Sequence, residues 1–299
     1  MQKKVVISGG SGLIGKSLSQ LLIDEGFEVC WLTRNPKKDN SFKQFYWNPL
    51  ENDIDEAALK NTDIVINLAG AGIADKLWTP SRKIVLFDSR VKAIEVLHQS
   101  FKKLNYWPKK FITASAIGFY GSRKGEYVNE FSVKGEGFLS DLCEKWEQTA
   151  DLFANEHVFT TKLRFGIVLA KNGGSLPVFQ RLNRIPWILL PNGKQMISWI
   201  HINDLLKIIL NTVKTDQYSE VVNVVSPNPV SLEEMIKSLN MVQNKKRITT
   251  SMPAFPVRLI AGDMSEIVLS DQHVIPEKLK NAGFIWDYPE LIPALRSLL

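Results

Sequence analysis

Short runs of β-branched and apolar residues alternate, through the first half of the chain, with longer segments whose apolar residues recur at helical spacing. This alternation is typical of βαβ units, which build a parallel sheet with helices on its faces. The predicted strands are Lys4–Ser8, Glu28–Thr33, Asp63–Leu68, Lys109–Ser115 and Thr160–Phe165. The predicted helices are Leu13–Glu25, Ser81–Leu104 and Gly137–Asn155. We therefore expect an α/β protein with a doubly wound parallel sheet, the Rossmann arrangement.

The alternation ends near Lys171. The segment Ile185–Pro191 is apolar but bracketed by prolines, which predicts neither a long helix nor a central strand. Ser198–Val213 predicts one more strand-to-helix passage and Val221–Val225 a strand, and the proline-rich remainder predicts a small helical lobe. We predict a dinucleotide-binding domain over residues 1–170, to which the chain returns at about 199–225, and a smaller substrate-side lobe formed by 171–198 and 226–299.

The turn after the first predicted strand is rich in glycine and fits two nucleotide-binding patterns. Gly10, Gly12 and Gly15 form G-x-G-x-x-G, whereas Gly10 through Ser17 form the G-x-x-x-x-G-K-[ST] of a P-loop. In both patterns the glycines let the backbone approach a pyrophosphate, which is bound by free N–H groups at a helix N-terminus. The turn therefore predicts a phosphate site without selecting the nucleotide.

Two features of the surrounding sequence favour a dinucleotide. A P-loop enzyme needs a second strand that ends in an acidic magnesium ligand, but the strand beginning at Asp63 ends in Asn67 and small residues. Lys16 is then a solvated helix residue. The second predicted strand ends in Thr33-Arg34, where NAD would require an acidic residue, and Arg34 can pair with a 2′-phosphate. We therefore predict NADP as the cofactor.

Several short motifs, spread from about residue 3 to 298, together resemble the extended short-chain dehydrogenase/reductase, or NAD-dependent epimerase/dehydratase, superfamily. They include Gly9-x-x-Gly12-x-x-Gly15, Asn67-Leu-Ala-Gly70, Ser115 before Tyr120-Gly121, and Trp199-Ile-His-Ile-Asn-Asp204. Ser89-Arg90, Trp146-Glu147 and the tail Pro276-x-x-Leu279-x-x-x-Gly283-Phe284 resemble the atypical "epimerase family" branch in particular. From the turn and the resemblance together, the predicted cofactor-binding residues are Gly9, Gly10, Ser11, Gly12, Leu13, Ile14, Gly15, Thr33, Arg34, Leu68, Ala69 and Gly70.

The resemblance implies a catalytic Tyr-x-x-x-Lys pair on the helix Gly137–Asn155, with a serine at the end of the preceding strand. If Glu147 follows the lysine by four residues, the lysine position is Cys143 and the tyrosine position is Leu139, and neither side chain can perform these roles. Ser115 keeps its place. Tyr120 is the candidate proton donor, and Lys145 would reach the site if the helix were rotated by about two residues from this alignment. The alternatives are that Tyr120 packs a wall of the cofactor site and that Lys145 is solvated.

Other candidate residues change this interpretation little. The four histidines show no paired ligand spacing, so we expect no metal site. His201 and Asp204, at a strand-to-helix junction, suit local hydrogen bonding better than proton transfer. Arg181, Arg184 and Lys194 lie on the irregular segment, where they are candidate contacts for a phosphorylated or acidic substrate.

Composition narrows the class of partner. The 37 Lys and Arg residues against 31 Asp and Glu give a net charge of +6, but the charges are interspersed, which favours a small-molecule substrate over nucleic acid. Two cysteines without paired spacing and no long apolar run predict a cytoplasmic protein that does not enter a membrane.

Two functional hypotheses follow. The resemblance implies an NADP(H)-dependent oxidoreductase or epimerase-like enzyme acting on a sugar-nucleotide-like or other small carbonyl or alcohol compound. The absence of Tyr and Lys at positions 139 and 143 favours the alternative, an NADP(H)-binding sensor or scaffold without turnover. The substrate, the direction of reaction and the oligomeric state are left open by the sequence.

Overall fold

The computed structural model describes residues 2–37, 41–182, 187–191, 193–245 and 248–299. The chain forms two compact units, each assembled from three stretches of sequence. Unit 1 comprises Met1–Ser115, Leu142–Leu163 and Leu206–Val222, and unit 2 comprises Ala116–Asp141, Arg164–Leu205 and Asn223–Leu299. The division into two domains at residue 170 stays a prediction.

Unit 1 is built on a large, mostly parallel sheet. In the described part of the chain this sheet has eight strands in the order β14-β8-β6-β5-β1-β2-β3-β4. Strand β1 pairs in parallel with both β2 and β5, and only the edge strand β4 is antiparallel to its neighbour among the registers described. The strands are β1 (Lys4–Ser8), β2 (Glu28–Thr33), β3 (Lys43–Asn48), β4 (Asp53–Ile54), β5 (Ile64–Asn67), β6 (Lys110–Ala116), β8 (Phe159–Phe165) and β14 (Glu220–Val224). The predicted doubly wound sheet is therefore confirmed.

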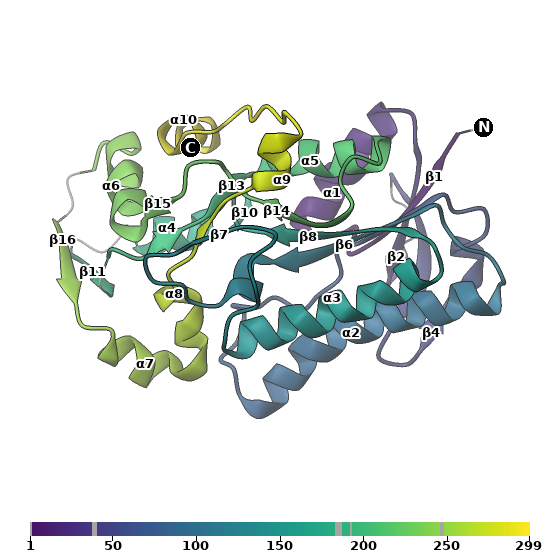
Figure 1. Cartoon of the computed structure of the whole chain (residues 1–299), viewed down its shortest axis with the longest axis horizontal. Coiled ribbons are helices and arrows are strands. Elements are labelled where there is room, and N and C mark those ends of the chain that lie inside the picture. Colours follow the sequence, from purple (N-terminus) through teal and green to yellow (C-terminus); the bar gives the residue numbers. More distant parts are fainter. Residues whose placement is uncertain (1, 38–40, 183–186, 192, 246–247) are drawn as a thin grey trace. The chain divides into compact units, whose positions relative to one another are not determined.

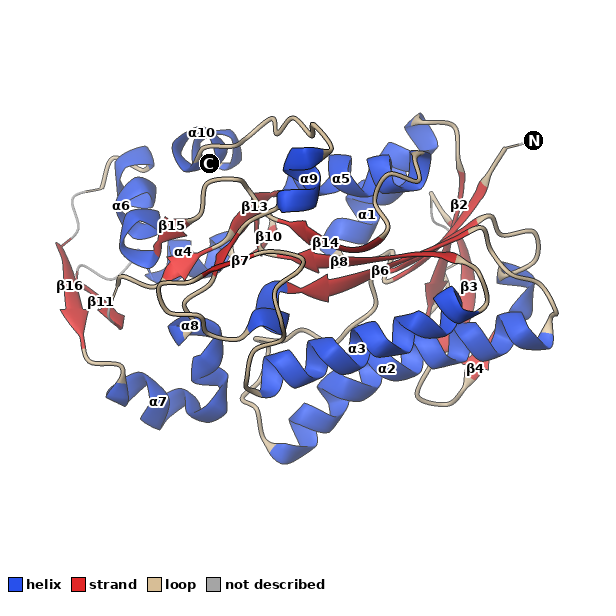
Figure 2. Ribbon diagram, viewed as in Figure 1, coloured by secondary structure: helices blue, strands red, loops and turns tan. Residues whose placement is uncertain are grey.

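Helices cover both faces of this sheet (Figures 1 and 2), with α1 and α5 on one side and α2 and α3 on the other. They are α1 (Leu13–Asp24), α2 (Pro80–Lys103), α3 (Phe138–Asn155) and α5 (Ile202–Lys214), with a 3-10 turn η1 (Glu56–Ala58). Helix α2 begins where the Thr79 hydroxyl accepts a hydrogen bond from the Arg82 N–H, 3.2 Å away, and Pro80 occupies the first turn. Edge-to-face packing of Phe101 on Phe153 joins α2 to α3.

Strand β3 is the element of unit 1 that the hydrophobic pattern does not predict. Its sequence, Lys-Gln-Phe-Tyr-Trp-Asn, has polar residues at both ends, and only Trp47 among them is buried. A half-exposed strand near a sheet edge needs no continuous apolar run, so its alternation of apolar and polar residues is a weak signal. Its position beside β2 places Trp47 next to the end of β2, which bears on the site described below.

Unit 2 combines short strand pairs with small helices. In chain order its elements are η2 (Ile117–Tyr120), β7 (Tyr127–Val128), β9 (Ile167–Ala170), β10 (Gly173–Gly174), α4 (Leu176–Leu182), β11 (Trp187–Pro191), β12 (Met196–Ile197), β13 (Trp199–His201), β15 (Val230–Ser231), α6 (Leu232–Val242), β16 (Ile248–Met252), α7 (Phe255–Ala261), η3 (Gly262–Ser265), α8 (Glu266–Leu269), β17 (His273–Val274), α9 (Glu277–Asn281) and α10 (Leu291–Leu298). Within the described residues, β11 pairs only with β16, in a two-stranded sheet, so residues 187–191 avoid a central strand as predicted.

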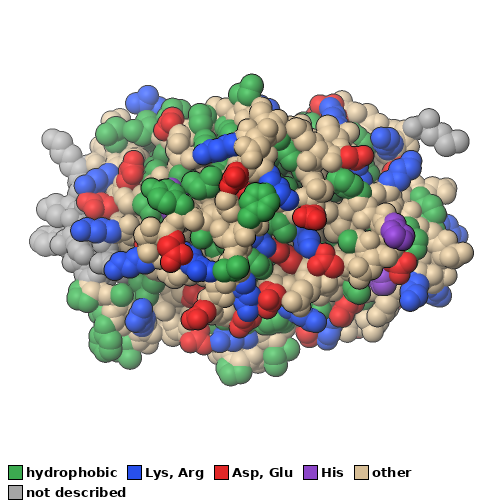
Figure 3. Space-filling view, in the orientation of Figure 1, with side chains coloured by type: hydrophobic (Ala, Val, Ile, Leu, Met, Phe, Trp, Pro, Cys, Tyr) green, Lys and Arg blue, Asp and Glu red, His purple; other side chains and the backbone are tan. Residues whose placement is uncertain are grey.

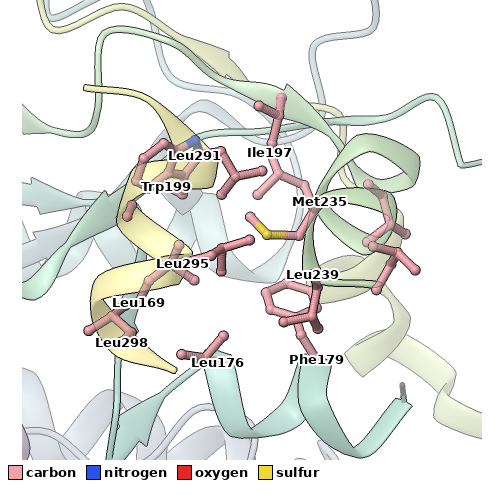
Figure 4. Packing of buried hydrophobic residues seen from close by; sticks show 14 residues of the cluster. Leu169, Leu176, Phe179, Ile197, Trp199, Met235, Leu239, Leu291, Leu295 and Leu298 are labelled. Atoms are coloured by element: carbon pink, nitrogen blue, oxygen red, sulfur yellow. The ribbon is translucent and has the colours of Figure 1, made fainter. Parts of the chain in front are cut away.

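The core of unit 2 is an apolar cluster between α6 and α10 (Figure 4). Met235 and Leu239 of α6 meet Leu291 and Leu295 of α10, and the fully buried Trp199 closes one side of the cluster. Helix α6 starts at Ser231, whose hydroxyl accepts a hydrogen bond from the Glu234 N–H at 3.1 Å. The amphipathic faces of α6 and α10 therefore supply most of this core.

The junction of β13 and α5 holds the C-terminal segment of unit 2 through buried polar groups. The Asp204 carboxylate accepts hydrogen bonds from the backbone N–H groups of Asp287 and Tyr288, at 2.7 and 3.0 Å. The His201 ring accepts a hydrogen bond from the Asn203 N–H at Nδ1, so Nε2 carries the proton toward Ser297 Oγ, 3.1 Å away. These contacts agree with the prediction that His201 and Asp204 form local hydrogen bonds at a strand-to-helix junction.

Acidic and basic side chains are mixed over the face drawn in Figure 3, where Lys and Arg alternate with Asp and Glu. In the part of the chain that the structure describes, no helix has the length and apolar content needed to cross a membrane. The described residues also contain no cluster of three or more His, Cys, Asp or Glu side chains placed to hold a metal ion.

We expect His201 to make unit 2 sensitive to mild acid. Burial lowers the pKa of His201 from 6.5 to about 4, so the unfolded chain takes up this proton at a higher pH than the folded chain does. The stability contribution is present above about pH 6.5 and is lost as the pH falls towards 4. Urea unfolding of the wild type and of His201→Gln across this range will measure it. The wild type should lose more stability than the variant, and parallel curves would contradict the assignment.

Candidate functional site

The carboxyl ends of three neighbouring strands of unit 1 are tied together by buried side chains. Ser8 Oγ donates a hydrogen bond to Asn67 Oδ1 over 2.5 Å, and Asn67 Nδ2 donates to Thr113 Oγ1 over 3.1 Å. All three residues are fully buried. Strands β1, β5 and β6 therefore end at a common level, and the turns that follow them meet there.

The glycine-rich turn after β1 fits against the turn after β5 because it lacks side chains. Gly9 has a φ of +76°, and a Cβ atom there would lie 2.8 Å from the backbone of Leu68. A Cβ atom on Gly15 would lie 2.3 Å from the carbonyl oxygen of Gly9. Helix α1 begins at Leu13, after the N-cap residue Gly12, which has no side chain to cap it, so the first N–H groups of the helix are available for a ligand.

A cavity of about 480 Å³ opens at this point, in the size range of cofactor sites. Eight predicted cofactor-binding residues line it: Gly9, Ser11, Gly12, Thr33, Arg34, Leu68, Ala69 and Gly70. Four others lie outside the lining, because Gly10 packs on the Trp31 ring and Leu13, Ile14 and Gly15 belong to the first turn of α1. The remaining lining residues are Leu32, Asn35, Trp47, Asn48, Pro49, Leu50, Ala71, Val85 and Ser89.

Charge and hydrogen-bonding capacity gather at the β2–β3 side of this cavity. Arg34 is exposed, and it is the only charged residue among those lining the cavity in the described part of the chain. Trp47 is 4% exposed, and its indole N–H is buried without a hydrogen-bond acceptor among the described residues. A cation and an unused donor at one end of a cavity suit a ligand rich in acceptor oxygens.

Trp47 and its neighbours Asn48 to Leu50 were not predicted as site residues, because β3 itself was not predicted. Their sequence carries no nucleotide-binding pattern, and what brings them to the cavity is the parallel pairing of β3 with β2. The tryptophan followed by Asn48 and Pro49, about 30 residues after the glycine turn, was the only available signal.

Ser115 lies near the end of β6 and is hydrogen-bonded to a buried carboxylate. Its Oγ donates to Glu147 Oε1 over 2.6 Å, and the two residues are 2% and 6% exposed. Glu147 lies one helical turn beyond the buried Cys143 on α3, and Leu139 lies one turn before it. Lys145 is exposed, which agrees with the solvated alternative. Ser115 is not among the residues that line the cavity.

Tyr120 is placed differently from the proton donor that the sequence suggested. Its side chain is fully buried in unit 2, where the hydroxyl donates to Asn223 Oδ1 and accepts from Arg164 Nη1, both at 2.8 Å. Burial raises the pKa of Tyr120 to about 12, which makes it a weaker acid than a free tyrosine. With both hydroxyl functions satisfied inside the core, Tyr120 has the environment of a structural residue, and we withdraw it as a catalytic candidate.

The three predicted substrate contacts are only partly described. Arg181 and Lys194 are both exposed in unit 2, and Arg181 Nε donates to the Pro177 carbonyl oxygen at 3.3 Å. Arg184 lies outside the described residues. Substrate contact by Arg181 and Lys194 stays a prediction.

Comparison with known proteins finds two family matches along the chain. Residues 5–136 match the NAD dependent epimerase/dehydratase family, and residues 252–298 match a domain of unknown function, DUF1731. An epimerase family protein of Staphylococcus aureus is 33% identical over 303 residues, which cover 99% of each chain.

Solved structures are similar over almost the whole chain. The human epimerase family protein SDR39U1 (isoform 2), crystallised with NADPH, has a TM-score of 0.86 and 26% identity, covering 99% of this chain and 98% of its own. A nucleoside-diphosphate sugar epimerase from Corynebacterium glutamicum has a TM-score of 0.81 and 28% identity, and the match covers all of this chain but 58% of that one. The chain therefore belongs to the NAD-dependent epimerase/dehydratase family, within the branch of epimerase family proteins to which human SDR39U1 also belongs.

Proposed function

We propose that this protein binds NADP(H) in the cavity of unit 1 and acts as an oxidoreductase or epimerase-like enzyme on a sugar-nucleotide-like or other small carbonyl or alcohol compound. The observation that carries the cofactor assignment is the exposed Arg34 at the end of β2, in a cavity whose described lining contains no acidic residue. An acidic residue there would hydrogen-bond a ribose 2′-hydroxyl and repel a 2′-phosphate. The NADPH of the human relative supports the same choice.

The residues present fit a dinucleotide along the whole cavity. The glycine turn and the start of α1 would hold the pyrophosphate, Arg34 would hold the 2′-phosphate, and the unused Trp47 N–H would donate to an acceptor at the adenosine end. Leu68 to Ala71 would support the opposite half. A bound NADP(H) supplies the hydride chemistry, so the protein has to orient the substrate and move one proton.

Ser115 and Glu147 form the pair that we assign to proton movement. Because the Ser115 hydroxyl donates to Glu147 Oε1 at 2.6 Å, its oxygen keeps lone pairs to which a substrate hydroxyl would donate; the substrate would have to reach a side chain that is 2% exposed and lies outside the cavity lining. In alcohol oxidation, with bound NADP⁺ supplying the hydride acceptor, the substrate proton would pass to Ser115 Oγ as the serine proton passes to Glu147 Oε1. Carbonyl reduction reverses these transfers.

The alternative function, a cofactor-binding sensor or scaffold without turnover, has its own supporting observation. Leu139 and Cys143 stand where the resemblance implies a tyrosine and a lysine, and neither can act as their replacement. A screen of carbonyl compounds and nucleotide sugars for NADPH oxidation or epimerisation separates the two. Turnover supports the enzyme, and tight NADPH binding without any turnover supports the sensor.

NADPH should bind more tightly than NADH, and Arg34→Ala should remove most of the difference. A charge-assisted hydrogen bond contributes about 1.5–3 kcal/mol, or about one to two decades in affinity. Isothermal titration calorimetry with both cofactors measures the effect. Equal affinities in the wild type would show that the 2′-phosphate is not recognised.

Lys16→Ala is the matched control, because Lys16 is also an exposed cation near the glycine turn but does not line the cavity. This variant should keep its NADPH affinity within a few-fold. If Lys16→Ala instead abolished binding, or abolished a measurable ATP hydrolysis, the P-loop interpretation of the turn would be restored.

Trp47→Phe should weaken NADPH binding roughly two- to ten-fold. The variant keeps an aromatic ring but loses one hydrogen-bond donor, and such a hydrogen bond contributes about 0.5–1.5 kcal/mol to binding. Trp286→Phe is the control, since the Trp286 N–H donates to the Val225 carbonyl oxygen at 3.1 Å within unit 2. The control should change thermal stability and leave affinity unchanged. Undiminished affinity in a folded Trp47→Phe protein would assign this N–H no role in binding.

Ser115→Ala and Glu147→Gln should each reduce any turnover by about 10²- to 10⁴-fold, the usual range for a positioned proton-transfer group. Cys143→Ala should leave turnover nearly unchanged.

Tyr120→Phe should lower the free energy of unfolding by about 1–3 kcal/mol, because it leaves buried polar partners unsatisfied, but should keep the rate per folded molecule. Loss of turnover in Tyr120→Phe at unchanged NADPH affinity would return Tyr120 to the catalytic site.

A further inference from the structure

Arg90, on helix α2, is held in unit 1 by neutral groups. Its Nη2 donates to the Ala71 carbonyl oxygen and its Nη1 to the Leu86 carbonyl oxygen, both at 3.1 Å. The guanidinium lies over the Trp146 ring of α3, with 5.0 Å between Cζ and the ring centroid. On the other side, a Cβ atom on Gly70 would come within 3.2 Å of Cζ. The guanidinium is therefore fixed at the turn that follows β5.

The positive charge of Arg90 has no acidic counterpart in the part of the chain that the structure describes. No ion pair of Arg90 is formed there, and the titratable groups that face it are the Cys143 thiol and a second cation, Arg82. Burial lowers the pKa of Arg90 to about 10, so the group still carries its charge at neutral pH. Its hydrogen bonds also leave some of its five N–H donors unused.

The strand order places this cation at one particular end of the cavity. Strand β1 and its glycine turn lie between β2 and β3 on one side and β5 and β6 on the other. Arg34 follows β2, and Trp47 lies in β3. These two residues would bind the adenosine half of the cofactor. The other half then extends over the ends of β5 and β6, where Arg90 contacts Ala71, a residue of the cavity lining.

We propose that Arg90 is a cofactor-discriminating residue whose uncompensated charge makes the site bind NADPH more tightly than NADP⁺. This inference rests on the proposed function. The nicotinamide ring is positively charged when oxidised and neutral when reduced, so a fixed guanidinium nearby repels only the oxidised form. The buried Trp146 N–H, which has no acceptor among the described residues, is a second unused donor, on the ring that packs against the Arg90 guanidinium. Cys143, at the position of the expected lysine, supplies no cation of its own.

The ratio of the dissociation constants of NADP⁺ and NADPH tests this role. At an effective dielectric constant of about 20–40, two charges less than a nanometre apart change an affinity by roughly 5- to 30-fold. We expect the wild type to prefer NADPH by about this factor, Arg90→Lys to keep most of the preference, and Arg90→Met to bring the ratio close to one. Fluorescence titration of NADPH and calorimetry of NADP⁺ give both constants without any turnover.

The ratio is insensitive to a purely structural effect, because a loosened turn would weaken both forms equally. Arg34→Ala is the matched control: it should weaken NADPH and NADP⁺ by the same factor and leave the ratio unchanged. The inference is overturned if the wild-type protein has a ratio near one, a result that requires no variant. It is also overturned if a folded Arg90→Met protein keeps the wild-type ratio. Failure of both cofactor forms to bind the wild type would instead overturn the proposed function itself.

Discussion

The site depends on one buried hydrogen-bonded bridge, in which the Asn67 side chain links Ser8 to Thr113 across three parallel strands. A buried amide can keep its donor and its acceptor only if both partners stay in place, so the bridge fixes the register of β1, β5 and β6 at their carboxyl ends. The close contact of Gly9 with the Leu68 backbone follows from this register. The cavity opens where the two turns meet, and the absence of a side chain at Gly9 allows their close approach.

Local features of the sequence sufficed to predict the central strands and the glycine-rich turn after β1, because glycine spacing and β-branched runs report on backbone geometry directly. Trp47 and Arg90 could not be predicted in the same way. Trp47 lines the cavity because β3 pairs with β2, and Arg90 contacts the lining residue Ala71 in the turn after β5. A half-exposed strand and an isolated arginine on a helix give no periodic signal.

The contrast between Tyr120 and Ser115 shows why residue type and position along the chain are insufficient to assign a proton donor. Both follow or end the same strand and both carry a hydroxyl. The Tyr120 hydroxyl uses its donor and its acceptor within the core of unit 2, whereas Ser115 donates to a carboxylate and its oxygen accepts no hydrogen bond from the described residues. Hydrogen-bond satisfaction, which no sequence pattern records, separates a structural hydroxyl from one that can take part in chemistry.

The two arginines of unit 1 illustrate how cations of the same type can have different consequences for one ligand. Arg34 is exposed, so its interaction with a phosphate would be screened by solvent and salt. Arg90 is enclosed by a tryptophan ring and backbone carbonyl oxygens, so its field is screened less and acts on whatever lies beside it. A charge that the fold leaves uncompensated in such a place costs folding free energy, which is a reason to seek its role in the bound state. Binding of a neutral ring would leave that charge undisturbed, whereas a cationic ring would add to its cost.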